Sequence, residues 1–184
     1  MTIAAIVLAA GEGSRFAGPT HKLLAPFRGR PLWTWAVDAA LTAGFDATYV
    51  VTGAVELSVA GPAIVVRNEA WASGQATSLR AGVATAAAAG HDAIVIGLGD
   101  QPLIAADAWQ AVASATGTPI AVASFDGERR PPVRLAAEVW PLLPTSGDDG
   151  GRVLMRERPD LVTAVPCSGE PVDIDTLEDL ERWS

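Results

Sequence analysis

The residues best suited to chemistry form a glycine turn that carries two cations. An apolar run ends in the segment 8–16, which reads LAAGEGSRF, and Lys22 follows in the run KLL at 22–24. Gly11 and Gly13 can take backbone angles closed to other residues, so consecutive N–H groups can point at one anion while Arg15 and Lys22 neutralise it. The segment predicts a phosphate-binding loop after a strand. A purely structural strand-to-helix turn is the alternative.

Two other phosphate-binding motifs are absent from this loop. A dinucleotide fingerprint needs a third glycine where Phe16 stands, and a Walker loop needs Gly-Lys-Ser/Thr where the chain reads GPT at 18–20. Lys22 is the only lysine of the chain. As a loop residue it is expected to bury little, so its removal should hardly change thermal stability.

Carboxylates follow one apolar run and precede the last predicted helix. Asp100 comes directly after Leu98-Gly99, and Asp173 and Asp175 lie just before Thr176. Two carboxylates beside a phosphate-binding loop would form a site for a Mg²⁺-triphosphate, where catalysis consists of positioning and charge stabilisation. Helix capping or turn formation is the alternative role for Asp100, and more so for Asp175.

Small polar residues fill the segment from Asn68 to Leu79, which leads from a predicted strand into a helix. Gly74 and Ser78 can let a planar base lie against the backbone. An ordinary capped helix start explains the same residues without a ligand.

Composition narrows the classes of function. With 184 residues, 49% hydrophobic and 18% charged, the chain is expected to form one globular domain over 1–184. The formal net charge of −8 disfavours nucleic-acid binding.

No apolar run reaches the roughly 20 residues of a membrane span and no basic leader opens the chain, so a cytoplasmic protein without membrane contact is expected. Two histidines and one cysteine are too few for a zinc site, so any metal should be a hard ion such as Mg²⁺.

Short apolar runs alternate with helical stretches. The predicted strands are Ile3–Leu8, Thr48–Thr52, Ala63–Arg67, Ala93–Gly97, Ile120–Ser124 and Leu161–Val165. The predicted helices run from Pro31 or Leu32 to Ala43, from Thr77 to Ala89, from Ala105 to Ala115, from Ala136 to Leu143 and from Thr176 to Trp183. Strands that are continuously apolar are typical of a sheet buried on both faces, so we predict a three-layer α/β fold with a mostly parallel sheet.

The loops at the carboxyl ends of these strands are expected to share one crevice. The loop-rich stretches Phe125–Arg134 and Pro144–Gly151 are expected to be insertions that lie over it.

Five ordered motifs together resemble the MobA-like nucleotidyltransferases over essentially the whole chain. They are LAAGxGxR with KLL at 8–24, GxxxSL at 74–79, LGDQP at 98–102, GDDGGR at 147–152 and DIDTxEDL at 173–180. The likeness is greatest to the molybdenum cofactor cytidylyltransferase branch. It implies a Rossmann-like nucleotidyltransferase fold, dependence on Mg²⁺, and attack of an acceptor phosphate on a nucleoside triphosphate with release of pyrophosphate. In this family Ala-Ala-Gly, present at 9–11, goes with cytosine. CTP is therefore the expected donor and molybdopterin, or its molybdenum form, the expected acceptor.

The resemblance also implies roles for individual residues. Arg15, Lys22 and Asp100 are the expected catalytic residues, and Asp100 with Asp175 or Asp173 should bind the metal. The expected nucleotide-binding residues are Leu8, Ala9, Ala10, Gly11, Gly13, Ser14, Arg15, Lys22, Asn68, Gly74 and Ser78. The expected acceptor-binding residues are Gln101, Arg134, Asp148 and Arg152.

Two positions depart from the family pattern. Ala17 stands before Gly18 and three further residues precede Lys22, so the loop is longer than usual, and Gly151 stands where alanine is common.

Other functions stay open on the sequence alone. They are the same transfer to a different phosphorylated acceptor, a maturation factor that hands a finished cofactor to a molybdoenzyme, and a pigment or quinone reductase. The missing dinucleotide fingerprint counts against the reductase.

Overall fold

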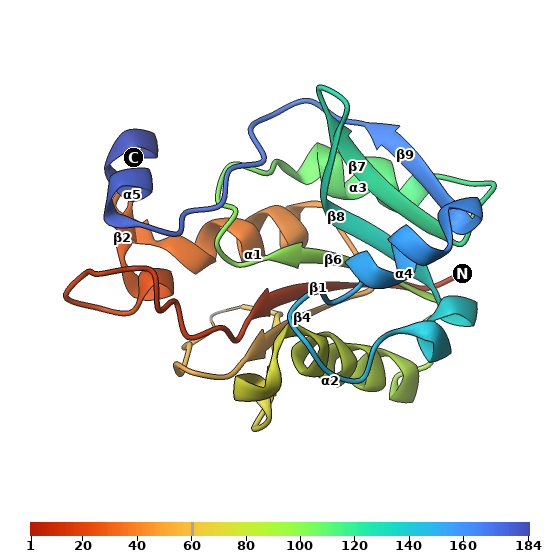
Figure 1. Cartoon of the computed structure of the whole chain (residues 1–184), viewed down its shortest axis with the longest axis horizontal. Coiled ribbons are helices and arrows are strands. Elements are labelled where there is room, and N and C mark those ends of the chain that lie inside the picture. The colour runs from red at the N-terminus through yellow and green to blue at the C-terminus, as the bar shows by residue number, and fades with distance from the viewer. Residues whose placement is uncertain (60) are drawn as a thin grey trace.

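The computed structural model describes residues 1–59 and 61–184 and is built around a seven-stranded sheet (Figure 1). The strand order is β5-β4-β1-β6-β8-β7-β9. The strands are β1 (Ile3–Ala9), β4 (Ala47–Thr52), β5 (Ile64–Arg67), β6 (Ala93–Leu98), β7 (Ile120–Phe125), β8 (Glu128–Ala136) and β9 (Val162–Pro166). A separate small ribbon pairs β2 (Pro26–Phe27) with β3 (Arg30–Pro31). β1 pairs in parallel with β4 and β6, whereas β8 runs antiparallel to both of its neighbours. The predicted α/β fold with a mostly parallel sheet is confirmed.

Five α-helices and four 3₁₀ turns connect the strands in the described part of the chain. The helices are α1 (Leu32–Thr42), α2 (Gln75–Ala88), α3 (Ala106–Ser114), α4 (Arg152–Glu157) and α5 (Leu177–Trp183), and the 3₁₀ turns are Lys22–Leu24, Trp71–Ser73, Ala137–Leu142 and Pro159–Leu161. The predicted helix over 136–143 is wrong in type, because it is a 3₁₀ turn that contains Pro141, which cannot donate an α-helical hydrogen bond. Among residues 1–59 and 61–184, no helix is both long and apolar enough to cross a bilayer.

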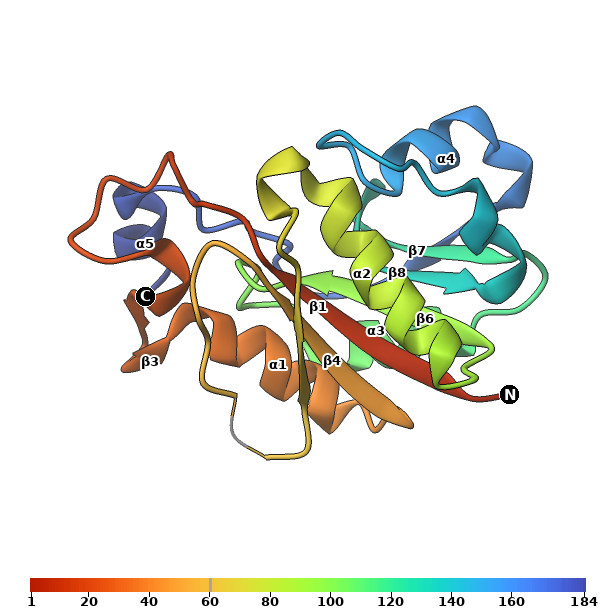
Figure 2. The same ribbon diagram turned by 90° about the horizontal axis from the view of Figure 1, so that it is seen from below.

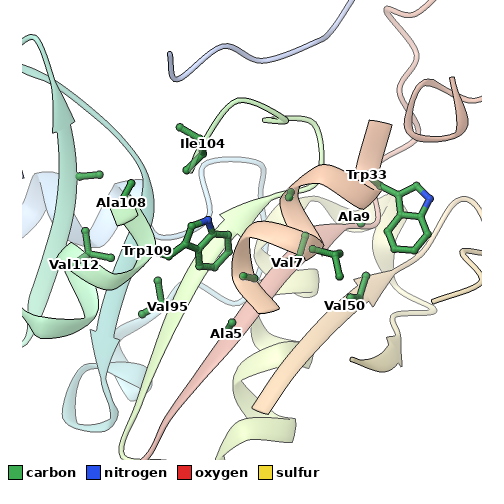
Figure 3. Packing of buried hydrophobic residues seen from close by; sticks show 14 of the residues in the cluster. Ala5, Val7, Ala9, Trp33, Val50, Val95, Ile104, Ala108, Trp109 and Val112 are labelled. Carbon is green, nitrogen blue, oxygen red and sulfur yellow. The ribbon is translucent and has the colours of Figure 1, made fainter. Parts of the chain in front are cut away.

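The apolar strands separate two cores. Ala5 and Val7 of β1 face the layer of α1 and α3, and Ala4 and Ile6 face the layer of α2. Figure 3 shows the first layer, in which Trp109 of α3 lies over the sheet beside Val95. Burial on both faces explains why these strands are continuously apolar in sequence.

The expectation of a loop over 125–134 is wrong, because these residues form most of β8 and its hairpin turn. The turn uses Asp126 and Gly127, both at positive φ. Pro131 and Pro132 fall where the register with β7 shifts between Val122 and Ala123. A bulge needs no ladder hydrogen bond at these positions, so two prolines fit inside a central strand.

All the strands of the large sheet except β8 run in the same direction, so the loops that follow β1, β4 and β6 emerge at one edge. Figure 2 shows the red loop after β1 and helix α5 beyond this same end of the sheet. The carboxyl edge is where ligands bind in open α/β sheets.

Close packing at Gly97 generates a stability prediction. A Cβ at Gly97 would overlap the indole ring of Trp109, so Gly97→Ala should lower the free energy of unfolding by about 1–3 kcal/mol. Gly151→Ala is the matched control, because its added methyl would meet only Leu79 at 3.9 Å. Urea unfolding of both variants tests this expectation, and equal stabilities of the two would contradict it.

Candidate active site

A cavity of about 430 Å³ opens at the carboxyl edge of the sheet, between the loop after β1, the start of α2 and the loop after β6. Most of the predicted site residues line it: Leu8, Ala9, Gly11, Gly13, Ser14, Arg15, Lys22, Gly74, Ser78, Asp100, Asp148 and Asp175. Segments from the two ends of the chain therefore meet around one space.

The glycine turn shapes the path of the Lys22 side chain. Gly13 has φ +67°, an angle that favours glycine. A Cβ there would lie 3.0 Å from Cγ of Lys22, so the missing side chain also leaves room for the lysine. Gly11 has open space where a Cβ would point.

His21 fixes the far end of the turn. Leu23 N–H donates to Nδ1 of His21 (3.2 Å), so Nε2 carries the ring proton and donates to the Gly11 carbonyl (3.0 Å). The extra residues of the loop therefore do not carry Lys22 away from the cavity.

Lys22 bridges two carboxylates. Its Nζ lies 2.6 Å from Oδ2 of Asp100 and 2.8 Å from Oδ1 of Asp175. Arg15 contacts the other oxygen of Asp175 at 2.9 Å, but its side chain is 75% exposed whereas that of Lys22 is 10% exposed. Burial lowers the pKa of Lys22, but the charges and hydrogen bonds of Asp100 and Asp175 outweigh it, so the pKa is raised overall. The expectation that this lysine buries little is wrong.

The segment 173–175 is held against Asp100 by its backbone. The Ile174 N–H donates to the Asp100 carbonyl (2.9 Å), and the Ile174 side chain is fully buried. Asp175 thereby comes beside Lys22, while Thr176 and Asp179 form a capping box that starts α5. Thr176, not Asp175, is the capping residue, so the Asp175 carboxylate is available to the site.

Asp173 and Gln101 pair with each other behind the cavity. Nε2 of Gln101 donates to Oδ1 of Asp173 (2.8 Å), and neither residue lines the cavity. Burial raises the pKa of Asp173, as do the nearby charges of Asp100 and Asp175. Of the two candidate aspartates, Asp175 lines the cavity and shares Lys22 with Asp100. No three His, Cys, Asp or Glu side chains among the described residues form a metal-binding group.

Asn68 and Ala10 contribute to the frame of the site and do not line the cavity. Nδ2 of Asn68 donates to Thr77 and Ser78 at 2.9 Å each, which ties the end of β5 to the start of α2. Ala10 is buried in the α2-side core, and its carbonyl accepts the Ala54 N–H. Both side chains pack in this frame, and their contact with the nucleotide stays a prediction.

The loop 144–151 packs against α2 and reaches the cavity, as predicted. The Ala76 N–H donates to the Gly147 carbonyl (2.9 Å). A Cβ at Gly74, which has φ +105°, would lie 2.6 Å from that carbonyl oxygen. Gly74 therefore permits the close approach that places Asp148 at the cavity wall.

A second cavity of about 190 Å³ adjoins the first, and Leu8, Gln75 and Leu98 line both. Its walls are mainly hydrocarbon side chains, and Arg129, Arg130 and Arg152 also line it. Arg152 thus lies in the second cavity, not in the first.

Arg134 lies away from both cavities, near the opposite edge of the sheet. Its guanidinium donates to the Thr118 carbonyl (2.6 Å), and burial lowers its pKa. Its β8 neighbours Val133 and Leu135 line the second cavity, and alternation along the strand turns Arg134 to the other face. Arg134 therefore lines neither of the two adjoining cavities, and its role in acceptor binding stays a prediction.

Several cavity residues were not predicted from the sequence, among them Glu12, Trp71 and Gln75. Gln75 follows Gly74 inside the recognised GxxxSL motif, so its position next to Gly74 was the available signal. Trp71 belongs to the polar segment 68–79, where a tryptophan outside a predicted helix is the corresponding signal.

The bridge made by Lys22 generates a second stability prediction. Lys22→Met keeps the aliphatic stem but leaves Asp100 without a cation and Asp175 with only the exposed Arg15, so the free energy of unfolding should fall by about 3 kcal/mol. Arg15→Gln should change it by less than about 0.5 kcal/mol, because that ion pair is mostly exposed. Urea unfolding at pH 7 measures both, and a Lys22→Met variant as stable as the parent would contradict the structural role.

Comparison with known proteins agrees with the motifs. The model of the MobA-like NTP transferase domain matches residues 5–162. The chain is 33% identical to nicotine blue oxidoreductase of Paenarthrobacter nicotinovorans, over 98% of this chain and 95% of that one. A solved nucleotidyl transferase from Methanothermobacter superposes with a TM-score of 0.83 at 29% identity, over 98% and 95% of the two chains. Rv0371C of Mycobacterium tuberculosis H37Rv, solved in complex with manganese, gives 0.75 at 26% identity over 100% and 98%. The chain therefore belongs to the MobA-like NTP transferase family and is a nucleotidyltransferase.

Proposed function

We propose that this nucleotidyltransferase transfers CMP from CTP to molybdopterin or its molybdenum form, with Mg²⁺ and with release of pyrophosphate. The observation that carries the proposal is the convergence of the glycine turn, two cations and two carboxylates on one cavity. The motif Ala-Ala-Gly at 9–11 supports cytosine as the base, through the resemblance to the cytidylyltransferase branch.

The carboxylates of Asp100 and Asp175 fit a magnesium ion. Both present oxygen to the same point, and oxygen is the ligand that Mg²⁺ prefers. Oδ1 of Asp100 is buried and has no hydrogen-bond partner among the described residues, so it is available as a further ligand atom. The manganese complex of the relative from Mycobacterium tuberculosis is consistent with a divalent ion in this family. When bound, such an ion would neutralise charge on the phosphates.

The chain's own residues position the triphosphate. Gly11, Gly13 and Arg15 line the cavity, so backbone amides and a guanidinium are available there for the phosphates. An oxygen of the acceptor phosphate attacks the α-phosphorus, a new P–O bond forms, and the bond to the leaving pyrophosphate breaks with its electron pair. No side chain is needed as nucleophile, because the acceptor phosphate supplies it.

The second cavity is the proposed acceptor subsite. It adjoins the first at Leu8, Gln75 and Leu98, so an acceptor seated there meets the nucleotide at the shared wall. Arg129, Arg130 and Arg152 form no ion pair among the described residues. In a chain of net charge −8 these arginines provide local attraction for an anionic acceptor.

Pyrophosphate release tests the proposal. The parent protein should release pyrophosphate only when Mg²⁺, CTP and molybdopterin are all present, and GTP should support a lower kcat/KM than CTP. Release of pyrophosphate with another phosphorylated compound, but not with molybdopterin, would show that the acceptor is a different compound. Tight molybdopterin binding without pyrophosphate release would favour a maturation factor. Oxidation of NADH that depends on an added pigment or quinone would favour a reductase.

Asp100→Asn should lower kcat for pyrophosphate release by about 10³-fold, because the amide keeps the shape of the turn but loses the charge that holds the metal. Its melting temperature should stay near that of the parent, since Lys22 keeps its contact with Asp175. Normal turnover of a destabilised Asp100→Asn variant would show a capping role in place of the metal role.

Arg152→Gln should raise the KM for molybdopterin roughly tenfold, the loss expected for one charged hydrogen bond. The KM for CTP should be unchanged, because Arg152 does not line the first cavity. Arg156→Gln, one turn further along α4, is the control, since Arg156 lines neither cavity. If only the KM for CTP rises, Arg152 binds the nucleotide and not the acceptor.

A further inference from the structure

We infer that Lys22 is an exchangeable counter-cation of the metal site, so that the site accepts a divalent ion readily only together with a triphosphate. The inference deepens the proposed function, because it takes Asp100 and Asp175 as the metal ligands.

The ammonium group of Lys22 holds one oxygen of each carboxylate that a divalent ion would use. Its Nζ lies 2.6 Å and 2.8 Å from one oxygen of each carboxylate. A magnesium ion held by the same two oxygens would lie about 2.0–2.1 Å from each of them. An ion and an ammonium that share these two oxygens carry like charges and repel each other. Lys22 therefore competes with a divalent ion for these two oxygens.

Two cations neutralise the two proposed metal ligands when no metal is bound. Two carboxylates, Asp100 and Asp175, face two cations, Lys22 and Arg15. Lys22 is mostly buried, so the carboxylates gain from it a contact that solvent screens little. A free divalent ion has to displace this contact and leaves the ammonium without a counter-charge, which weakens its binding.

A triphosphate removes that penalty. Lys22 lines the 430 Å³ cavity, and its flexible stem passes along Gly13, so its ammonium can turn into the cavity by bond rotation. Phosphate oxygens in the cavity would replace the two carboxylates as its partners. The same lysine then serves the carboxylates in the empty enzyme and the phosphates in the loaded one, so the metal and the nucleotide favour each other's binding.

Binding of Mn²⁺ by titration calorimetry tests the exchange without any turnover. We expect the parent protein to bind Mn²⁺ alone weakly, and roughly tenfold or more tightly in the presence of a non-hydrolysable CTP analogue. Lys22→Met should bind Mn²⁺ alone about tenfold more tightly than the parent does, and the analogue should improve this affinity much less. Arg158→Gln removes one exposed positive charge that pairs with Asp160 far from the cavity, and it should leave both affinities unchanged.

The outcomes separate this inference from the proposed function. If the parent and Lys22→Met bind Mn²⁺ alone equally, while Asp100→Asn abolishes binding in both backgrounds, the metal site stands and the exchange is wrong. If Asp100→Asn leaves Mn²⁺ binding unchanged, the metal site itself is wrong. Circular dichroism of Lys22→Met at the titration temperature shows that the variant is folded, and Lys22→Gln provides a second neutral variant if it is not.

Discussion

One buried ammonium between two carboxylates joins segments that are far apart in the chain. Lys22 and Asp100 are 78 residues apart in sequence, and Lys22 and Asp175 are 153 apart. The three groups come from the loop after β1, the loop after β6 and the segment before α5. Lys22 is the most buried of the three and would be costly to bury alone, so its position depends on the two carboxylates. The cavity at the carboxyl edge takes its shape from this arrangement.

The parallel sheet supplies the frame for that interaction. β1 lies between β4 and β6, and in-register parallel pairing brings Leu8 beside Leu98. The loops that carry Lys22 and Asp100 therefore leave the sheet side by side. The backbone bond from Ile174 to Asp100, together with the buried Ile174 side chain, adds the third segment without a further strand. Local strand pairing and a single apolar anchor are thus enough to assemble a charged site.

The sequence predicts the parts of this structure that depend on local pattern and composition. Continuously apolar strands, helices that end at glycine, and the glycine turn with its cations could all be read from neighbouring residues. β8 could not, because its charged start and its two prolines resemble a loop, and only pairing with β6 and β7 makes it a strand. The burial of Lys22 and the orientation of Arg134 toward the other face of the sheet could not be predicted from the sequence either, because both follow from contacts between distant residues. The roles of Asp173 and Asp175, which are alike in sequence, separate only through the Ile174 backbone bond.

The wide separation of Lys22 and Asp175 along the chain also bears on the order of folding. Contacts between residues so far apart close large loops, so they cost more loop-closure entropy than contacts within a helix do. The α/β frame can therefore assemble while the carboxylate from the last segment is still absent. Until Ile174 seats against Asp100, Lys22 has one carboxylate partner instead of two. The second partner of Lys22 thus comes from the far end of the chain and depends on the seating of a single buried isoleucine.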